Sequence, residues 1–174
     1  MSQQHVDLWN QTAAAFDERY KAITEEQWSA STPCEGWTVK DLVEHTVGVQ
    51  GGMVAPTFGI DVPEGAEWPA IHAAISAGLT AESLAGTTEF GPMGTVPKGM
   101  LAGIATNDLL LHTWDLSRAI GADDTLPAEA VTACLGGMKM FPEAMREGRF
   151  SAAIEIGDDA DEQAQLIAAS GRQV

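Results

Sequence analysis

The sequence predicts an all-α protein with four or five long helices packed as a bundle. Apolar residues recur every three or four positions over long stretches of the chain, which is the pattern of amphipathic helices. Short segments rich in Gly, Pro and Thr separate these stretches and are typical of turns. Strict alternation of apolar and polar residues, which marks a half-buried strand, is almost absent. Helix-on-helix packing is therefore the architecture that we expect.

The first half of the chain contains three of these helices. The spacing of apolar residues predicts the first helix over 4–24. Thr38 and Asp41 match a capping box, so a second helix should begin there and end near the glycines of 50–52. A third apolar stripe predicts a helix over about 68–85.

The second half begins with a connection and continues with the most apolar helix. Residues 86–97 are rich in Gly, Thr and Pro and predict a connection with at most a short extended turn. The apolar helix runs over 98–120 and is ended by Gly121 in the C-cap position. A further helix is expected within 125–148, and the tail from Phe150 combines a short alternating stretch with a small terminal helix.

Length and cysteine usage indicate one domain in a reducing compartment. The 174 residues fit a single domain, 1–174, of ordinary size. Cys34 and Cys134 lack the spacing of a redox or zinc-binding pair, so both are expected to be free thiols. The N-terminus has no basic segment followed by an apolar core, and no apolar run is long enough to span a bilayer. We therefore expect a cytoplasmic protein with no membrane partner.

The charge balance excludes nucleic acids as partners. The chain has 9 Lys and Arg against 25 Asp and Glu, with a formal net charge of −16 at pH 7. Such a surface repels the phosphates of nucleic acids. The sequence also has no GxGxxG, P-loop or GxSxG motif, so nucleotide binding and serine hydrolysis have no support.

Three ionisable residues interrupt the apolar helix 98–120. Asp108, His112 and Asp115 fall within about 60° of one another on an α-helix, because each residue turns about 100°. The rest of this face is apolar, so Asp108 and His112 are expected to point inward. A buried carboxylate is costly unless it is paired, and basic residues are scarce in this chain. A divalent cation would neutralise it instead.

The second helix supplies a matching side chain. His45 lies at the apolar edge of its helix and can face His112. Together with Asp108 the two histidines make a three-ligand set with open coordination positions, suited to zinc, nickel, iron or manganese. The alternatives are ordinary ones: an acid four residues before a histidine is common on exposed helices, and His45 fits a partly exposed helical residue. Asp115 is expected to support a ligand from behind or to pair with Arg118.

Other chemically interesting side chains have simpler interpretations. Cys34 precedes a helix N-terminus, where the helix dipole can lower the pKa of a thiol, but a small buried residue is the favoured interpretation. Trp37 and Trp114 are expected to be core residues, although both flank the proposed ligands in sequence and could wall a pocket.

Two segments of the chain resemble a known family. "PCEGWTVKDLVEHTVG" (33–48) and "TNDLLLHTWDLSRAIG" (106–121) resemble the metal-binding, DinB-like domain of the mycothiol-dependent maleylpyruvate isomerases and of many small actinobacterial proteins. The resemblance covers essentially the whole chain and is closest to the short, single-domain branch, whose function is unassigned. It implies a DinB-like four-helix bundle with a short C-terminal extension. It also implies a divalent metal, usually zinc, on His45, Asp108 and His112.

The resemblance also raises alternatives. The isomerases have Glu where this chain has Asp108, and DinB-like relatives with three histidine ligands make His72 a rival ligand, although a core or rim position is favoured for it. The isomerases carry an additional C-terminal domain that helps to hold the thiol, and this sequence has only about 25 residues beyond Arg149. A decayed site that binds no metal is a further alternative.

Two functions are candidates, of which the resemblance implies the first. One is a metal-binding enzyme, a mycothiol-dependent transferase or isomerase that presents a thiol to an electrophilic substrate. The other is a non-catalytic, metal-stabilised helical bundle that serves dimerisation or small-molecule binding. Dimers are common among bundles of this size, so a homodimer is a candidate in either case.

Overall fold

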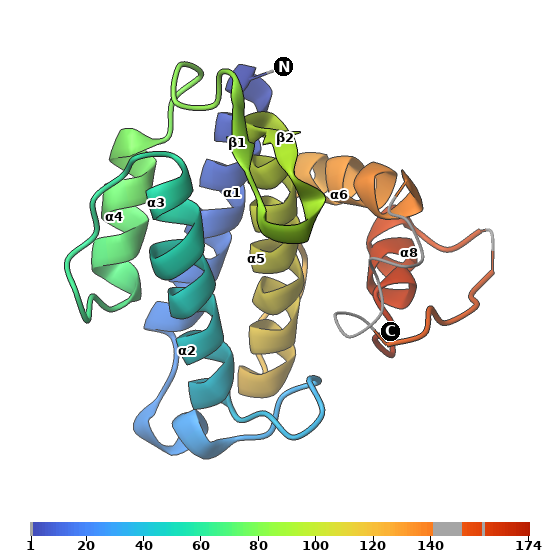
Figure 1. Cartoon of the computed structure of the whole chain (residues 1–174). Coiled ribbons are helices and arrows are strands. Elements are labelled where there is room, and N and C mark those ends of the chain that lie inside the picture. The colour runs from blue at the N-terminus through green and yellow to red at the C-terminus, as the bar shows by residue number, and fades with distance from the viewer. Residues whose placement is uncertain (1, 141–150, 158) are drawn as a thin grey trace.

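The computed structural model describes residues 2–140, 151–157 and 159–174, most of which lie in helices (Figure 1). Of the predicted all-α fold class, the mainly helical character is confirmed, and a small two-stranded sheet is added to it. The helices are α1 (Ser2–Lys21), α2 (Val39–Val49), α3 (Ala55–Thr57), α4 (Trp68–Gly78), α5 (Lys98–Ile120), α6 (Ala128–Met140) and α8 (Glu162–Ala169). Shorter helical turns are η1 (Glu25–Ser29), η2 (Gln50–Val54) and η3 (Gly91–Met93).

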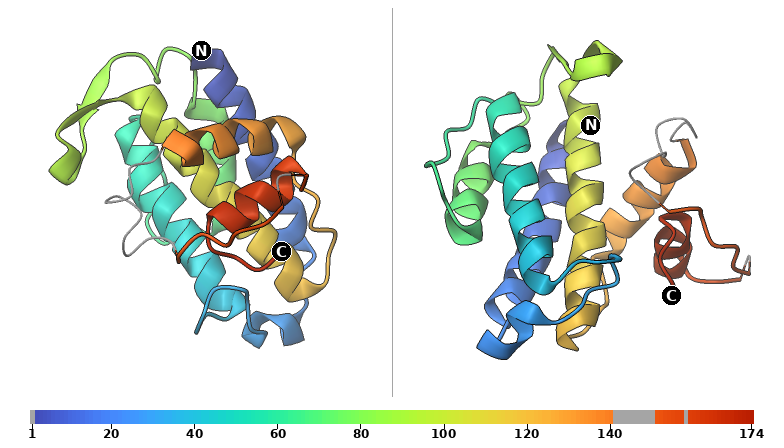
Figure 2. Two further views of the ribbon diagram at one scale, coloured as in Figure 1. Left: turned by 90° about the vertical axis from the view of Figure 1, so that its right-hand side faces the viewer. Right: turned by 60° about the horizontal axis from the view of Figure 1, so that its bottom comes forward.

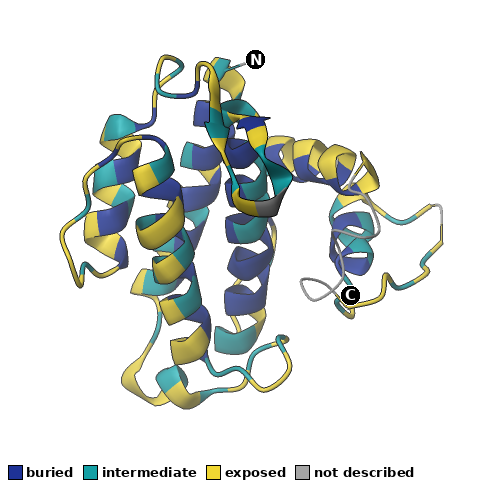
Figure 3. Ribbon diagram, viewed as in Figure 1, coloured by how far each residue is buried: buried dark blue, intermediate teal, exposed yellow. Residues whose placement is uncertain are grey.

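Helix α5 is the centre of the molecule. It packs against α1 and α2 on one side and against α6 on the other, while α4 packs on α1 and α2 and α8 packs on α6. Figures 1 and 2 show α1, α2, α4 and α5 side by side, with α6 and α8 beyond α5. Residues 109–117 of α5 are all buried, so this part of the helix is covered on every side. The outer helices expose one face (Figure 3).

Two clusters of buried side chains lie on opposite sides of α5. The larger one joins α1, α2, α4 and α5 and includes Trp9, Phe16 and Trp68. The smaller one joins α5, α6 and α8 and includes Leu110 and Leu166. The apolar character of α5 on nearly all faces follows from this position between two cores.

Helix α2 ends at Val49, close to the predicted position, but helical structure continues past the glycines of 50–52. The chain passes into the π-helical turn η2 and then into α3, which ends at Thr57. Gly51 instead permits a close approach to α4: a Cβ atom on Gly51 would lie 2.8 Å from Cδ1 of Ile71. This glycine serves packing between helices and not termination.

The third helix is shorter than predicted. The expected range was about 68–85, and α4 ends at Gly78, after which the backbone of Leu79 is extended. A Cβ atom at Gly78 would lie 2.7 Å from Cγ1 of Ile60, so the loop before α4 folds back onto the end of this helix.

The connection over 86–97 contains a small sheet. Strands β1 (Thr87–Glu89) and β2 (Thr95–Pro97) pair antiparallel, with Thr88 opposite Val96. The extended turn expected there is therefore a β-hairpin, and it lies beside the N-terminal end of α5 (Figure 1).

The remaining boundaries are close to those predicted. Gly121 ends α5 with a positive φ of 69°, as its C-cap position indicated. The helix expected within 125–148 begins at Ala128 and is described as far as Met140, and residues 141–150 lie outside the described residues. Among the described residues, no helix combines the length and apolarity that crossing a membrane requires.

Candidate metal centre

Helix α2 carries the first of the three predicted ligands, and a capping box fixes where α2 begins. Oγ1 of Thr38 accepts a hydrogen bond from the backbone N–H of Asp41 at 3.3 Å, and Oδ2 of Asp41 accepts from the backbone N–H of Thr38 at 2.8 Å. These reciprocal bonds satisfy donors that would otherwise be free at the helix N-terminus. His45 follows two turns later, on the side of α2 that faces α5.

The structure brings His45, Asp108 and His112 together. Nε2 of His45 lies 3.5 Å from Oδ1 of Asp108, and Nε2 of His112 lies 3.7 Å from the same oxygen. One potential ligand atom from each residue lies within 4.8 Å of the other two. Ligands held at about 2.0–2.1 Å by a tetrahedral zinc ion lie about 3.4 Å apart, so small shifts would close this set on one ion.

The carboxylate of Asp108 has an unsatisfied oxygen. Its Oδ2 is buried and has no hydrogen-bond partner among the residues that the structure describes. A buried acceptor without a donor is costly, and more so when it is charged. The side chain of Asp108 is 27% exposed and that of His112 is 10% exposed. The prediction that both point inward is thus right for His112, whereas Asp108 lies at the rim, where a cation could enter.

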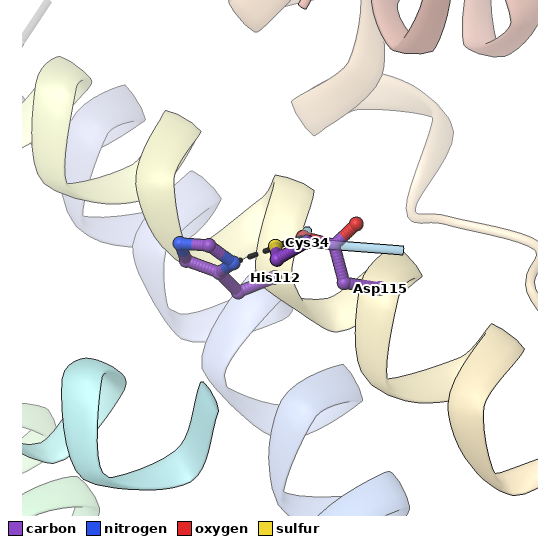
Figure 4. A group of neighbouring side chains, drawn as sticks. All are labelled: Cys34, His112 and Asp115. Carbon is purple, nitrogen blue, oxygen red and sulfur yellow. Dashed lines mark hydrogen bonds and ion pairs between the residues drawn. The ribbon is translucent and has the colours of Figure 1, made fainter. Parts of the chain in front are cut away.

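A second carboxylate, that of Asp115, lies behind His112 and is completely buried. Its Oδ2 lies 2.9 Å from Nδ1 of His112 (Figure 4). Burial opposes ionisation of Asp115, but hydrogen bonds from His112 and Arg172 outweigh it and lower the pKa of the carboxyl to about 2. The ionised carboxylate can only accept, so Nδ1 of His112 donates to it, and Nε2 is the ring nitrogen that faces Asp108.

The cation that neutralises Asp115 comes from the C-terminal tail. Nε of Arg172 lies 2.7 Å from Oδ1 of Asp115, and Nη2 lies 2.7 Å from Oδ2. The prediction of an ion pair between Asp115 and Arg118 is wrong. Arg118 is largely exposed and instead binds Asp124 at 3.0 Å, because its place on α5 turns it outward. No local pattern in the sequence pointed to Arg172 as the partner of Asp115; the only hint was the general scarcity of basic residues.

Cys34 joins this network. Its Sγ lies 3.3 Å from Oδ2 of Asp115, and Figure 4 shows Cys34, His112 and Asp115 as a second group whose potential ligand atoms lie within 4.8 Å of one another. Burial, and then the charge of Asp115, raise the pKa of the Cys34 thiol to about 12. Arg172 already neutralises the carboxylate of this group, so the group holds no uncompensated negative charge that calls for a cation. These three residues therefore form a hydrogen-bonded support behind His112.

Both cysteines are free, as predicted. The expectation that Cys34 is a small buried residue needs correction, because it is half-buried and donates to Asp115. Cys134 is buried between helices in the smaller core cluster.

Trp37 forms a wall of the site, whereas Trp114 does not. The Trp37 ring stacks on His112 with centroids 5.9 Å apart and is tilted against His45 with centroids 4.9 Å apart. Trp114 belongs to the core cluster on the other side of α5. Of the two tryptophans that flank the ligands in sequence, only Trp37 is placed against the ligand rings by the fold.

His72 has the core or rim position that was favoured for it. Its ring stacks on Trp68 with centroids 5.4 Å apart, and its Nδ1 lies 3.7 Å from Oδ1 of Asp17. Among the described residues, His72 belongs to neither group of potential metal ligands.

Comparison with known proteins gives the family of the N-terminal part of this fold. Residues 9–84 match the family described as the mycothiol maleylpyruvate isomerase N-terminal domain. The family predicted from the sequence is confirmed for these residues. The matched residues include α2 and His45, while α5 with Asp108 and His112 follows them.

The curated relatives extend the comparison to more of the chain. Two uncharacterized proteins from two strains of Mycobacterium tuberculosis are each 32% identical to it over 121 residues. The alignment covers 66% of this chain and 66% of each relative, so the chain spans about two thirds of their length. No solved structure gave a significant match.

Proposed function

We propose that this protein is a DinB-like, single-domain four-helix bundle that binds one divalent metal ion through His45, Asp108 and His112. One observation carries the proposal: two imidazole nitrogens lie 3.5 Å and 3.7 Å from the same oxygen of Asp108, whose other oxygen is buried and has no partner in the described part of the chain. The cost of this arrangement without a cation is high, and the ligand types suit a metal ion. The family of residues 9–84 supports the same interpretation.

Zinc is the first candidate for this ion, with nickel, iron and manganese as alternatives. Two imidazoles with one carboxylate suit a borderline-soft cation and leave coordination positions open. Asp108 is one methylene shorter than the glutamate of the isomerase pattern. The carboxylate of Asp108 nonetheless lies within reach of both histidines, so the shorter side chain does not preclude direct ligation.

The proposed activity is that of a thiol-dependent transferase or isomerase. When bound, the metal would supply a Lewis acid that allows a thiol to ionise at neutral pH. The residues of the chain have separate tasks: Asp115 holds the proton of His112 on Nδ1, and Trp37 covers the two imidazole rings. Mycothiol, named in the family description, is the thiol that we propose, and an electrophilic small molecule is the second substrate.

A second candidate function is a non-catalytic bundle in which the metal joins helices. The observation that favours it is the origin of the ligands, because His45 comes from α2 and the other two come from α5. A metal held by both helices would stabilise the bundle, which could then serve small-molecule binding or pairing with a second copy of the chain.

Metal content tests the shared part of both proposals. The protein is stripped with a chelator, dialysed against Zn²⁺ and analysed for bound metal. We expect one ion per chain in the wild type and almost none in His45→Ala and His112→Ala. His72→Ala is the matched control and should keep full occupancy, because His72 lies against Trp68 and Asp17. Loss of zinc from the wild type, or full occupancy in both ligand variants, would contradict the proposal.

Two further measurements separate the functions. A conjugation assay with a generic electrophile and several small thiols, including mycothiol, should show metal-dependent turnover that His112→Ala abolishes if the protein is an enzyme. Thermal melts with and without chelator address the structural role, because an ion that joins helices should raise Tm markedly by its binding to the folded state alone. Absence of turnover together with a large chelator effect would favour the non-catalytic bundle.

A further inference from the structure

Residues 170–172 bring the C-terminal tail to Asp115, on the side of His112 that faces away from Asp108. Ser170 ends α8, Gly171 turns the chain with a φ of 81°, and Arg172 then extends toward α5. Arg172 and Asp115 are 57 positions apart, and the contact between them joins the C-terminal tail to the helix that carries two of the three proposed ligands.

We propose that Arg172 is a positioning residue for the metal centre, because it fixes the carboxylate of Asp115, which in turn holds the ring of His112 in the orientation that ligation needs. This inference rests on the proposed metal binding. It assigns a role in that site to the tail, which lies outside the residues matched by the family.

The geometry of the pair supports a positioning role. Two guanidinium nitrogens bind one carboxylate oxygen each, both at 2.7 Å, and this is the two-point arrangement of a planar fork. The side chain of Arg172 is 13% exposed and that of Asp115 is fully buried. Because both oxygens are held, the carboxylate plane cannot rotate, and Oδ2 stays directed at Nδ1 of His112.

The C-terminal tail is itself held by hydrogen bonds, so the position of the Arg172 guanidinium is fixed. Nη1 of Arg172 donates to Oγ of Ser170 at 3.1 Å, and that hydroxyl donates to the backbone carbonyl of Ile167 at 2.7 Å. Ile167 is buried in the core cluster between α5, α6 and α8. The chain of contacts thus runs from a packed helix through Ser170 and Arg172 to Asp115.

The neighbouring arginines of the site do not replace Arg172. Arg19 donates to Oγ of Ser117 and to the backbone carbonyls of Asp123 and Thr125. Arg118 binds Asp124 on the surface. Among the described residues, loss of Arg172 would therefore leave the buried Asp115 with the imidazole and thiol donors alone, and its carboxylate would be free to turn.

The test measures both metal affinity and the state of the His112 ring. Wild type, Arg172→Met, Arg172→Lys and the control Arg118→Met are titrated with Co²⁺ in competition with a chromophoric chelator, and the visible absorption of bound Co²⁺ is recorded. Separately, NMR of metal-free, ¹⁵N-labelled protein reports which ring nitrogen of His112 carries the proton. Circular dichroism checks that each variant is folded.

Arg172→Met should lower the Co²⁺ affinity about 10–100-fold, which is the usual effect of removing the support of a ligand. Its absorption spectrum should shift, and the His112 ring should show a mixture of tautomers in place of the Nδ1–H form. Arg172→Lys keeps the charge but loses the fork, so we expect a smaller loss, about 3–10-fold. Arg118→Met should match the wild type, because its partner Asp124 lies away from the site.

Wild-type affinity and an unchanged His112 tautomer in Arg172→Met would overturn the inference. If Arg172→Met does not fold, the same result in Arg172→Lys would overturn the role of the fork. If the wild type binds no Co²⁺ or Zn²⁺, the proposed function fails, and the NMR comparison of metal-free proteins still decides whether Arg172 orders His112. The two failures are thus distinguishable.

Discussion

Oδ2 of Asp115 lies 2.9 Å from Nδ1 of His112, which precedes it by one turn on α5. The opposite nitrogen of the same ring, Nε2, lies 3.7 Å from Asp108. The two carboxylates on this helix therefore act on opposite sides of one imidazole. Arg172 neutralises Asp115, whereas Asp108 has one oxygen without a partner among the described residues. This difference is why we assign the metal to Asp108 and a supporting role to Asp115.

The two groups of potential ligands share His112, and they predict different effects of substituting Cys34 on metal binding. Cys34→Ser should leave zinc occupancy unchanged, because the Cys34 thiol donates to Asp115, whose carboxylate Arg172 already neutralises. His45→Ala should reduce occupancy to near zero, since His45 belongs only to the group with Asp108. Elemental analysis of both variants after dialysis against Zn²⁺ makes the comparison. The reverse outcome would assign the metal to Cys34, His112 and Asp115.

Asp115 should give the stability of the metal-free protein a specific pH dependence. Its pKa is lowered in the folded state from the ordinary value of 3.8 to about 2, so its ionised form stabilises the fold above pH 3.8 and this contribution is lost as the pH falls toward 2. The full contribution is about 2 kcal/mol, and about 1 kcal/mol of it should be lost by pH 3.

Urea unfolding of wild type and Asp115→Asn in the presence of chelator isolates this contribution. The difference in free energy of unfolding between the two proteins should be constant from pH 7 to about pH 5 and should shrink below pH 4. A difference that does not change down to pH 3 would show that Asp115 is not ionised by its partners in the way that we describe.

Trp37 should report metal binding by fluorescence. Its ring lies 4.9 Å from the ring of His45 and 5.9 Å from that of His112, so a quenching ion such as Co²⁺ at these ligands would lie close to the indole. Addition of Co²⁺ should quench part of the emission in the wild type, and Trp37→Phe should remove most of this response. The matched control is Trp28→Phe, because Trp28 packs edge-on against Tyr20. Equal quenching in both variants would place the ion elsewhere.

Thr38 should contribute to stability without contributing to the site. Thr38→Ala removes the side-chain half of the capping box that begins α2, and the expected loss in free energy of unfolding is about 1 kcal/mol. His45 lies two turns away and is held by the packing of α2 on α5, so zinc occupancy at saturating metal should not change. Chemical unfolding and metal analysis of the same preparation test the two parts. Loss of the metal in a folded Thr38→Ala protein would show that the cap positions His45.

Local chemistry in the sequence predicted several features correctly. Thr38 and Asp41 predicted where α2 begins, and Gly121 predicted where α5 ends, because capping depends on residues within one turn. The shared face of Asp108, His112 and Asp115 follows from the helical repeat alone. Metal binding by His45, Asp108 and His112 stays a prediction, although the fold brings the three side chains together.

Features that depend on contacts between distant segments were not predictable in this way. Gly51 is typical of a helix terminator, but in the fold it lets the turn η2 approach Ile71 on α4. Gly78 ends α4 where Ile60 packs against it, which shortened the predicted helix. Arg118 is the basic residue nearest to Asp115 along the chain. Its side chain points outward from α5 and binds Asp124, so it cannot pair with Asp115.

The sequence by itself determined that the chain is mainly helical, which family residues 9–84 match and which polar residues share a face of α5, because periodicity, motifs and capping are properties of neighbouring residues. Only the tertiary structure decided how the buried charges are compensated. Arg172 and Cys34 reach Asp115 from segments 57 and 81 positions away, and such pairs form through the packing of whole helices and not through any local pattern.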